Sequence, residues 1–458
     1  MSEMAVMQKQ SMDFLNGNIK HIYKKYLAAA FGSSLISCIY SVVDMAMVGN
    51  YKGPEGTAAL ATAMPVWSIL YSLGFLMGIG GSVIFSTIRG RTRNNEQKAN
   101  EYFTAASLGV TILSAVIWLL LIFCDTELLT LFGAKGSLLP IAREYVLPIK
   151  YVAPLFLLNQ MVAAFLRNDR APGLATKAVL IGGIFNVFGD YFFIFTLDWG
   201  VYGAGFATAL GAVITFLIML SHFFSKKNTL HFVKTEKVTK KLKEICITGF
   251  PTFFIDIAIG ILNVLLNRQI IYYLGTNALS VYAIVINITS FVQCCAYSVG
   301  QAAQPIISTN LGAGKGDRIK TTLKYALETT TGFALFWTIL SLSVPNFYTR
   351  IFMTPTDDIL KIAPHIIRCY GLSYLILPFN VFSTYYFQAL MKPKIAFVVS
   401  VARGVIISGI LIYLLPLLFG ADSIWFAMPI TEVLIVVYVI IKMLKYTKQL
   451  SNEEVRGI

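Results

Sequence analysis

Two acidic residues of this chain lie inside strongly apolar stretches. Asp190 follows Asn186 by four residues in FNVFGDYFFIF (185–195), so on a helix the two side chains share a face. Asp44 lies within a second apolar run, IYSVVDMAMVG (39–49). A charged side chain near the middle of a bilayer costs at least ~2.5–3.5 kcal/mol. If these runs cross a membrane, the acids indicate a functional site; the alternative is a structural hydrogen bond from a protonated aspartic acid.

Two buried carboxylates suit the binding of a small cation. They can take up a proton from one side of a membrane and release it when their environment changes. They can also combine with the amide of Asn186 and the hydroxyl of Thr208, in GAGFATAL (203–210), as oxygen ligands for Na⁺. These residues leave the choice between H⁺ and Na⁺ open. A cation that prefers one conformation then biases the conformational equilibrium.

The composition indicates an integral membrane protein. The chain has 458 residues, of which 56% are hydrophobic and 13% charged, whereas soluble domains are about 25% charged. Its net charge of +14 is spread between apolar runs, which favours membrane loops over a nucleic-acid surface. The six cysteines form no CxxC pair and no zinc spacing, so we expect reduced, packed thiols and no cofactor.

The apolar runs predict an all-α protein with twelve transmembrane helices, because a spanning helix needs about 20 mostly apolar residues. The predicted spans centre on 26–49, 58–84, 102–123, 145–166, 177–196, 203–224, 246–273, 278–303, 325–344, 366–390, 395–418 and 424–444. One set of alternating loops carries 28 Lys and Arg residues and the other carries 5. Positively charged loops favour the cytoplasm, so we expect a multi-pass protein of the cell membrane with both termini cytoplasmic.

The two halves of the chain resemble each other at one constant offset, which we call the repeat offset. It aligns KGPEGTAALA (52–61) with LGTNALSVYA (274–283), and GSVIFSTIRGRTR (81–93) with AQPIISTNLGAGK (303–315). We therefore predict an N-terminal six-helix lobe (1–225), a basic cytoplasmic linker (226–244) and a C-terminal six-helix lobe (245–458). Six helices per half give parallel repeats, two bundles around a central cleft, which is the plan of an alternating-access transporter.

Other charges also fall within predicted spans. Asp256 and Arg268 lie on the seventh span, twelve residues apart, and form a possible secondary polar site. Arg403 lies near the inner end of the eleventh span, where we expect it to extend to the cytoplasmic interface. At the repeat offset neither Asp44 nor Asp190 aligns with an acid, so the predicted ion site is confined to the first lobe.

Several of these stretches resemble the MATE (multidrug and toxin extrusion) transporter family, most closely its MepA-like bacterial branch. The resemblance covers nearly the whole chain. The stretches that show it are VDMAMVG (43–49), FNVFGDYFFIF followed by GVYGAGFAT, NVLLNRQIIYYLG (263–275), GQAAQPIISTNLGAGK (300–315), YYFQALMKPK (385–394) and WFAMPITE (425–432).

The resemblance implies cation-coupled efflux of organic, often cationic compounds. It implies an N-lobe cation site made of Asp44, Asn186, Asp190 and Thr208, because all four residue types of that site are present. The tenth span lacks the acid that some relatives carry, whereas Glu432 ends a twelfth-span stretch where relatives often have one.

We therefore expect a secondary active multidrug antiporter that exchanges organic compounds, often aromatic cations, for H⁺ or Na⁺. It is expected to work as a monomer in the lipid bilayer, without a nucleic-acid partner. The alternative transporter is a lipid-linked precursor flippase. Such a flippase needs several cationic residues in its cavity, whereas Arg268 is the one candidate in the middle of the predicted spans. A membrane enzyme using Asp44 and Asp190 as an acid/base pair is the rival of another class, but no HExxH or GxSxG motif accompanies them.

Overall fold

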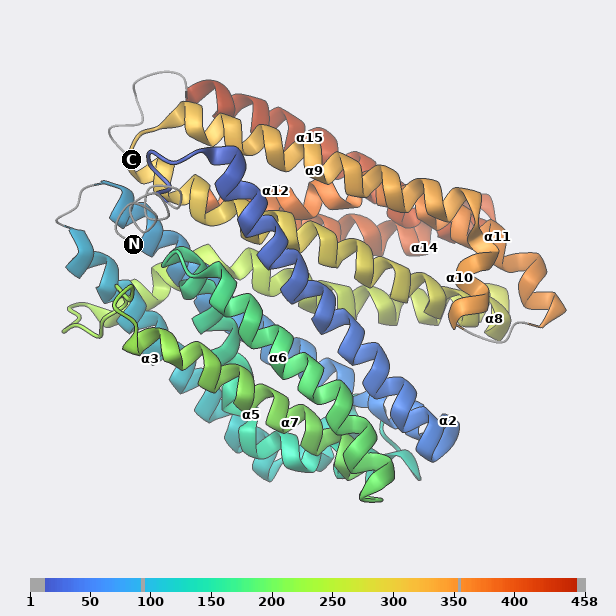
Figure 1. Ribbon diagram of the computed structural model, residues 1–458. Helices are drawn as coiled ribbons and strands as arrows, with labels where there is room; N and C mark the ends of the chain where they lie inside the picture. Colours follow the sequence, from blue (N-terminus) through green and yellow to red (C-terminus); the bar gives the residue numbers. More distant parts are fainter. Residues whose placement is uncertain (1–12, 92–94, 353–355, 451–458) are drawn as a thin grey trace. The chain divides into compact units, whose positions relative to one another are not determined.

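The computed structural model describes residues 13–91, 95–352 and 356–450, and every regular element in these ranges is a helix (Figure 1). The predicted cytoplasmic placement of residues 1–12 and of the tail beyond residue 450 falls outside the described ranges.

The first half of the chain forms six long apolar helices. The first element, α2 (Ile19–Arg91), is interrupted at Gly53, whose φ of 70° is a conformation that glycine adopts without strain. This break divides α2 into two spans, Ile19–Gly53 and Glu55–Arg91. The later elements are α3 (Glu96–Phe123), the short α4 (Asp125–Leu131), α5 (Leu138–Asn168), α6 (Pro172–Tyr191) with η2 (Phe192–Thr196), and α7 (Gly200–Leu220) with η3 (Ser221–Phe224).

The second half begins in the same way. Helix α8 (Val238–Gly312) is interrupted at Gly275, with φ 79°, and the repeat offset aligns Gly275 with Gly53. The later elements are α9 (Gly316–Ser343), α10 (Pro345–Phe352), α11 (Asp357–Gly371) with η4 (Leu372–Leu375), α12 (Leu377–Ala389), α13 (Pro393–Val401) with η5 (Ala402–Ile406), α14 (Ile407–Phe419), η6 (Ala421–Phe426) and α15 (Ala427–Gln449).

The prediction of twelve spans is confirmed. Within the described residues, ten helical stretches are long and apolar enough to cross a membrane when α8 is taken as one. Division of α8 at Gly275 adds one, and the pair α9 and α10, bent by 86°, adds another. The protein is therefore an all-helical, multi-pass membrane protein.

The chain packs as two units. One consists of residues 28–253, and the other of residues 1–27 together with 254–458. The second unit therefore includes the start of α2, where the Tyr23 hydroxyl donates to Thr329 Oγ1 at 3.1 Å. Arg318 Nη2 in the same unit donates to the carbonyl oxygens of Phe14 at 2.9 Å and Gly17 at 2.7 Å. The predicted lobe boundaries assigned the first residues to the first half and remain a prediction.

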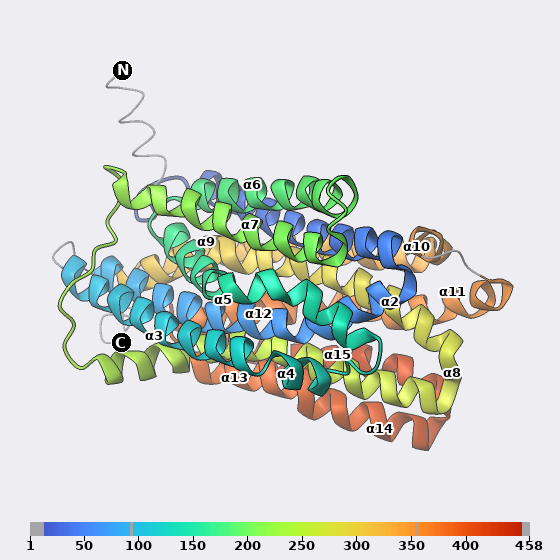
Figure 2. The same ribbon diagram turned by 90° about the horizontal axis from the view of Figure 1, so that it is seen from below.

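Within the unit 28–253, α6 and α7 run side by side and α5 packs against α7 (Figure 2). Glycines permit the close approach of α6 and α7: a Cβ atom on Gly182 would lie 2.6 Å from the carbonyl oxygen of Gly211. Small residues at helix contacts are typical of membrane proteins, where close backbone packing replaces the hydrophobic driving force. This contact lies about one turn from Asn186 and Thr208, and so fixes their separation.

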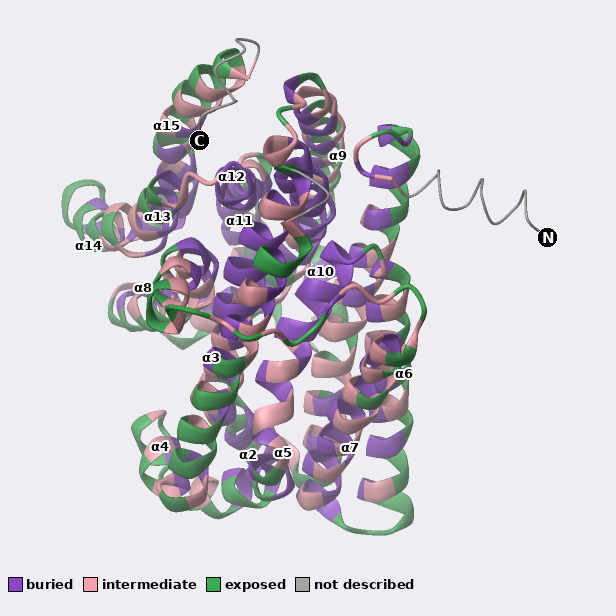
Figure 3. Ribbon diagram, turned by 90° about the vertical axis from the view of Figure 1, so that its left-hand side faces the viewer, coloured by how far each residue is buried: buried purple, intermediate pink, exposed green. Residues whose placement is uncertain are grey.

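Apolar side chains cover the outer faces of several helices. On α3 the exposed residues Leu108, Ile112, Val116 and Leu119 recur every three or four positions, and α14 has a similar face (Figure 3). Such a stripe is expected where a helix contacts lipid rather than water.

Candidate functional site

The four predicted cation-site residues are all buried in the unit 28–253. Asp44 comes from the first span of α2, Asn186 and Asp190 come from α6, and Thr208 comes from α7. The spacing of four places Asn186 and Asp190 on one face of α6, as the sequence predicted. That face points toward α7, because the Asn186 Nδ2 donates to Thr208 Oγ1 at 3.0 Å.

The two carboxylates lie near each other rather than on separate walls of the unit. Asp44 is close enough to Asp190 for their charges to interact. The Tyr145 hydroxyl on α5 donates to Asp44 Oδ2 at 2.5 Å, and the same tyrosine also interacts with Asp190 and Thr208. Three helices and the first span therefore converge on one polar cluster.

This cluster has more acceptors than donors. Asp190 accepts one long hydrogen bond, 3.4 Å from Asn186 Nδ2, and none of its surface is exposed. Three buried oxygens have no hydrogen-bond partner among the residues that the structure describes: Asp44 Oδ1, Asn186 Oδ1 and Asp190 Oδ2. Buried polar atoms are nearly always hydrogen-bonded, so several unpaired oxygens in one place require an explanation. Carboxylate and amide oxygens of this kind are ligands that a proton or a hard cation would satisfy.

Tyr145 was not identified from the sequence. It is one of 23 tyrosines, and nothing in its surroundings on α5 distinguishes it. The contact with Asp44 joins residues 101 positions apart, so it depends on how α5 packs and not on any spacing.

The structure does not bring Asp256 and Arg268 together. Both lie on α8, where twelve residues correspond to about 18 Å along the helix axis. Asp256 Oδ1 accepts a hydrogen bond from the Tyr297 hydroxyl at 3.1 Å, while Arg268 is exposed. The suggestion of a joint secondary site gains no support from this geometry.

The prediction that Arg403 extends to the interface is wrong. Arg403 lies in η5, is buried, and its Nε donates to Glu432 Oε1 at 2.7 Å. The Asn380 side chain on α12 donates to Glu432 Oε2 at 2.6 Å. The partner could not be recognised from the sequence, because Glu432 lies on a different helix, α15. A buried partner removes the reason for an arginine to reach toward water.

A small cavity lies beside this ion pair, within the second unit. It encloses about 30 Å³, enough for about two water molecules. Arg403, Ser400 and Gln293 line it together with apolar side chains of α8. Within the described part of the chain, the buried Ser400 hydroxyl has no hydrogen-bond partner, so the cavity presents a polar wall.

Comparison with known protein families identifies the same internal repeat that the sequence shows. The MatE family model matches residues 29–192 and 251–414, two segments that the repeat offset found within the sequence places on each other. Together they cover more than half of the chain.

Curated relatives match over most of their length. The multidrug export protein MepA of Staphylococcus saprophyticus is 25% identical over 403 residues, which is 87% of this chain and 88% of the relative. The protein of the same name from Staphylococcus aureus is 26% identical over 402 residues, again 87% of this chain and 88% of the relative.

Solved structures share the fold. An outward-facing multidrug resistance MATE transporter of the MOP superfamily superimposes with a TM-score of 0.89 at 20% identity, covering 97% of this chain and 99% of the other. A MOP superfamily transporter from Pyrococcus furiosus gives 0.87 at 19% identity, with the same coverage. With two matched segments of the family model in one twelve-span chain, the protein belongs to the MatE family of membrane transporters.

Proposed function

We propose that this protein is a secondary active multidrug exporter. It moves organic, mostly cationic compounds out of the cell in exchange for H⁺ or Na⁺, working as a monomer with both termini in the cytoplasm. The names of its relatives support export of several drugs. The single observation that supports coupling to a cation is the set of unpaired buried oxygens on Asp44, Asn186 and Asp190.

The site couples ion and substrate through charge. Two neighbouring carboxylates without a cation repel each other, and a bound H⁺ or Na⁺ relieves this repulsion. Relief of repulsion allows α2, α6 and α7 to pack more closely around the site. The cation therefore favours one conformation, and the substrate is exported when it favours the other.

The flippase alternative is not favoured. It needs free cationic side chains for lipid phosphates, but the buried Arg403 is already paired with Glu432. Arg268 lies on an exposed position of α8.

The test is transport by the purified protein in liposomes. Efflux of ethidium is followed under an imposed pH gradient and, separately, under a sodium gradient. The gradient that drives efflux identifies the coupling ion. The variant Asp190→Asn should lose efflux under that gradient, because an amide can neither bind a proton nor compensate a cation's charge.

The matched control is Asp198→Asn. Asp198 is an exposed carboxylate of the same half, which accepts a hydrogen bond from the Tyr51 hydroxyl at 2.9 Å. This variant should retain gradient-driven efflux. If the protein with Asp190→Asn pumps ethidium as well as the control does, the proposed coupling site is refuted.

A further inference from the structure

A basic segment crosses one end of the unit 28–253 in a fixed path. We call residues 224–243 the strap; it runs from the last residue of η3 into the first turns of α8. Its backbone is held at alternate residues: Thr229 N donates to Asp169 Oδ2 at 3.0 Å, and His231 N donates to Asn100 Oδ1 at 3.0 Å. Val233 N then donates to Thr104 Oγ1 at 3.1 Å, so the strap follows the end of α3.

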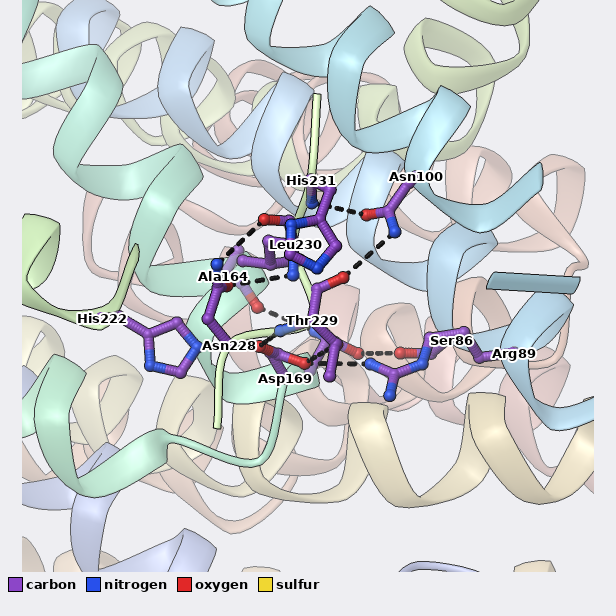
Figure 4. A network of polar contacts seen from close by, with 11 residues as sticks. Ser86, Arg89, Asn100, Ala164, Asp169, His222, Asn228, Thr229, Leu230 and His231 are labelled. Atoms are coloured by element: carbon purple, nitrogen blue, oxygen red, sulfur yellow. Dashed lines mark hydrogen bonds and ion pairs between the residues drawn. The ribbon is translucent and has the colours of Figure 1, made fainter. Parts of the chain in front are cut away.

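Asp169 is the centre of the contacts that hold the strap (Figure 4). It accepts from Arg89 Nη1 at 3.0 Å, pairs with His222 Nε2 at 2.7 Å, and also accepts from the Thr229 hydroxyl. Burial raises the pKa of the Asp169 carboxyl, but hydrogen bonds from His222 and Thr229, with the charge of Arg89, outweigh burial and hold it below its usual range. The carboxylate is therefore charged at neutral pH and keeps the strap in place.

The strap presents uncompensated positive charge to its surroundings. It contains a single acid, Glu236, against seven lysines. Lys241 pairs with Glu101 on α3. The other six are exposed and have no carboxylate within ion-pair distance among the described residues: Lys226, Lys227, Lys234, Lys237, Lys240 and Lys243. A fixed backbone that carries six free ammonium groups is preorganised for anions.

Exposed apolar residues place these lysines at the edge of the hydrocarbon region. Leu217 and Phe224 lie two turns apart on one exposed face of the helix that leads into the strap, and Phe224 is 91% exposed. Ile247, one turn beyond Lys243 on α8, is also exposed. Phe232, in the middle of the strap, is 69% exposed. Lysines flanked in this way by lipid-facing residues lie at the depth of lipid headgroups.

We propose that the strap is a binding surface for anionic phospholipids, whose phosphates contact its free lysines while their acyl chains contact Phe224, Phe232 and Ile247. Clusters of four to eight basic residues next to a transmembrane helix are typical of such recognition. A soluble acidic partner does not need the exposed aromatic and aliphatic side chains, whereas a lipid uses both kinds of contact.

The test is lipid binding to the full chain in dodecyl maltoside, followed by native mass spectrometry. The probes are dioctanoyl phosphatidylglycerol, dioctanoyl phosphatidylcholine and glycerol 3-phosphate. We expect phosphatidylglycerol to bind at least tenfold more tightly than either of the others. The choline lipid lacks the net charge, and glycerol 3-phosphate lacks the acyl chains.

The variant Lys234→Gln/Lys240→Gln/Lys243→Gln should weaken phosphatidylglycerol binding by about 100-fold, because each lysine near an anionic surface contributes roughly a factor of five. The matched control, Lys394→Gln/Lys445→Gln/Lys448→Gln, removes three exposed lysines from the other unit. It should leave binding within about twofold, since all six free lysines of the strap remain in place.

Three outcomes overturn the proposal. Equal losses in the two triple variants show a response to total charge rather than a site. Equal binding of phosphatidylcholine and phosphatidylglycerol shows that the protein contacts the acyl chains alone. Competition by glycerol 3-phosphate at the same concentration as phosphatidylglycerol shows a site for soluble phosphates instead of lipid.

Discussion

Asp190 and Glu432 are both carboxylates with none of their surface exposed, one in each packing unit, and their surroundings differ in kind. Both oxygens of Glu432 are bonded, one by the Arg403 guanidinium and the other by the Asn380 amide. Asp190 receives one long hydrogen bond from Asn186, and its other oxygen has no partner in the described ranges of the chain. The two carboxylates are therefore equally buried, but Glu432 is fully hydrogen-bonded and Asp190 is not.

This difference indicates that the two halves use their buried carboxylates for different purposes. Arg403 provides Glu432 with a permanent cation that is part of the chain. In the cluster of Asp44 and Asp190, no cationic side chain among the described residues takes that place. The residues come from corresponding parts of the two repeats: α5, α6 and α7 in one, and α12, η5 and α15 in the other. A site built to exchange a cation must leave its carboxylates unsatisfied, and a site built for stability must not.

The largest expected effect is on stability, with opposite consequences in the two clusters. Glu432→Gln leaves the buried Arg403 charge uncompensated, and loss of one partner from a buried pair costs about 3–5 kcal/mol. Asp190→Asn removes a charge that lacks compensation, so the free energy of unfolding should stay the same or rise. Thermal unfolding in detergent should place Glu432→Gln well below the wild type and Asp190→Asn at or above it. A similar loss in both variants contradicts the comparison.

The double variant Arg403→Met/Glu432→Leu sharpens the same comparison. Replacement of both members of a buried ion pair by apolar side chains of similar volume is often neutral, because no charge is left unpaired. It should recover about 2–4 kcal/mol of what Glu432→Gln loses. The measurement is a double-mutant cycle on the unfolding free energy. A double variant as unstable as Glu432→Gln would mean that Asn380, and not the charge pair, dominates.

The sequence predicted the parts of the fold that depend on composition and spacing. Twelve spans, the duplication at a constant offset and the shared face of Asn186 and Asp190 all follow from local patterns, and the structure has them. The contacts of Tyr145 with Asp44 and of Arg403 with Glu432 depend on how separate helices pack, and no periodicity encodes that. For this reason position alone predicts Arg403 at the interface, whereas its partner keeps it buried.

Another buried acid, Asp169, lies outside the spans and, like Glu432, has its carboxylate oxygens hydrogen-bonded. Its lowered pKa means that its contribution to stability is present above the pKa of the unfolded state, near 3.9, and is lost as the pH falls through the folded-state value. Below about pH 4 the strap should therefore loosen. The protection factors of the amides of Thr229, His231 and Val233, which compare intrinsic with observed hydrogen–deuterium exchange rates at each pH, should fall in acid.

Asp169→Asn should show low protection factors already at neutral pH and lose about 1.5–3 kcal/mol, the range for hydrogen bonds to charged groups. Its protection factors should then change little on acidification, since the titrating group is gone. Asp198→Asn serves as the control, because Asp198 is exposed and away from the strap. A loss of protection in acid that persists in Asp169→Asn assigns the pH response to another group.

The smallest effect is expected from Tyr145→Phe, which removes a single hydroxyl from the cation cluster. Asp44 Oδ2 then joins the three oxygens that already lack a partner. Loss of one donor to a charged group corresponds to about 1.5–3 kcal/mol when the carboxylate is empty. A bound cation compensates part of that loss, so the variant should bind its coupling ion more tightly and release it more slowly. In liposomes, efflux should saturate at a lower ion concentration and reach a lower maximal rate, whereas a change in maximal rate alone would assign Tyr145 to helix packing. The same substitution at Tyr297, which donates to Asp256 in the other unit, should leave both quantities unchanged if only the first unit exchanges a cation.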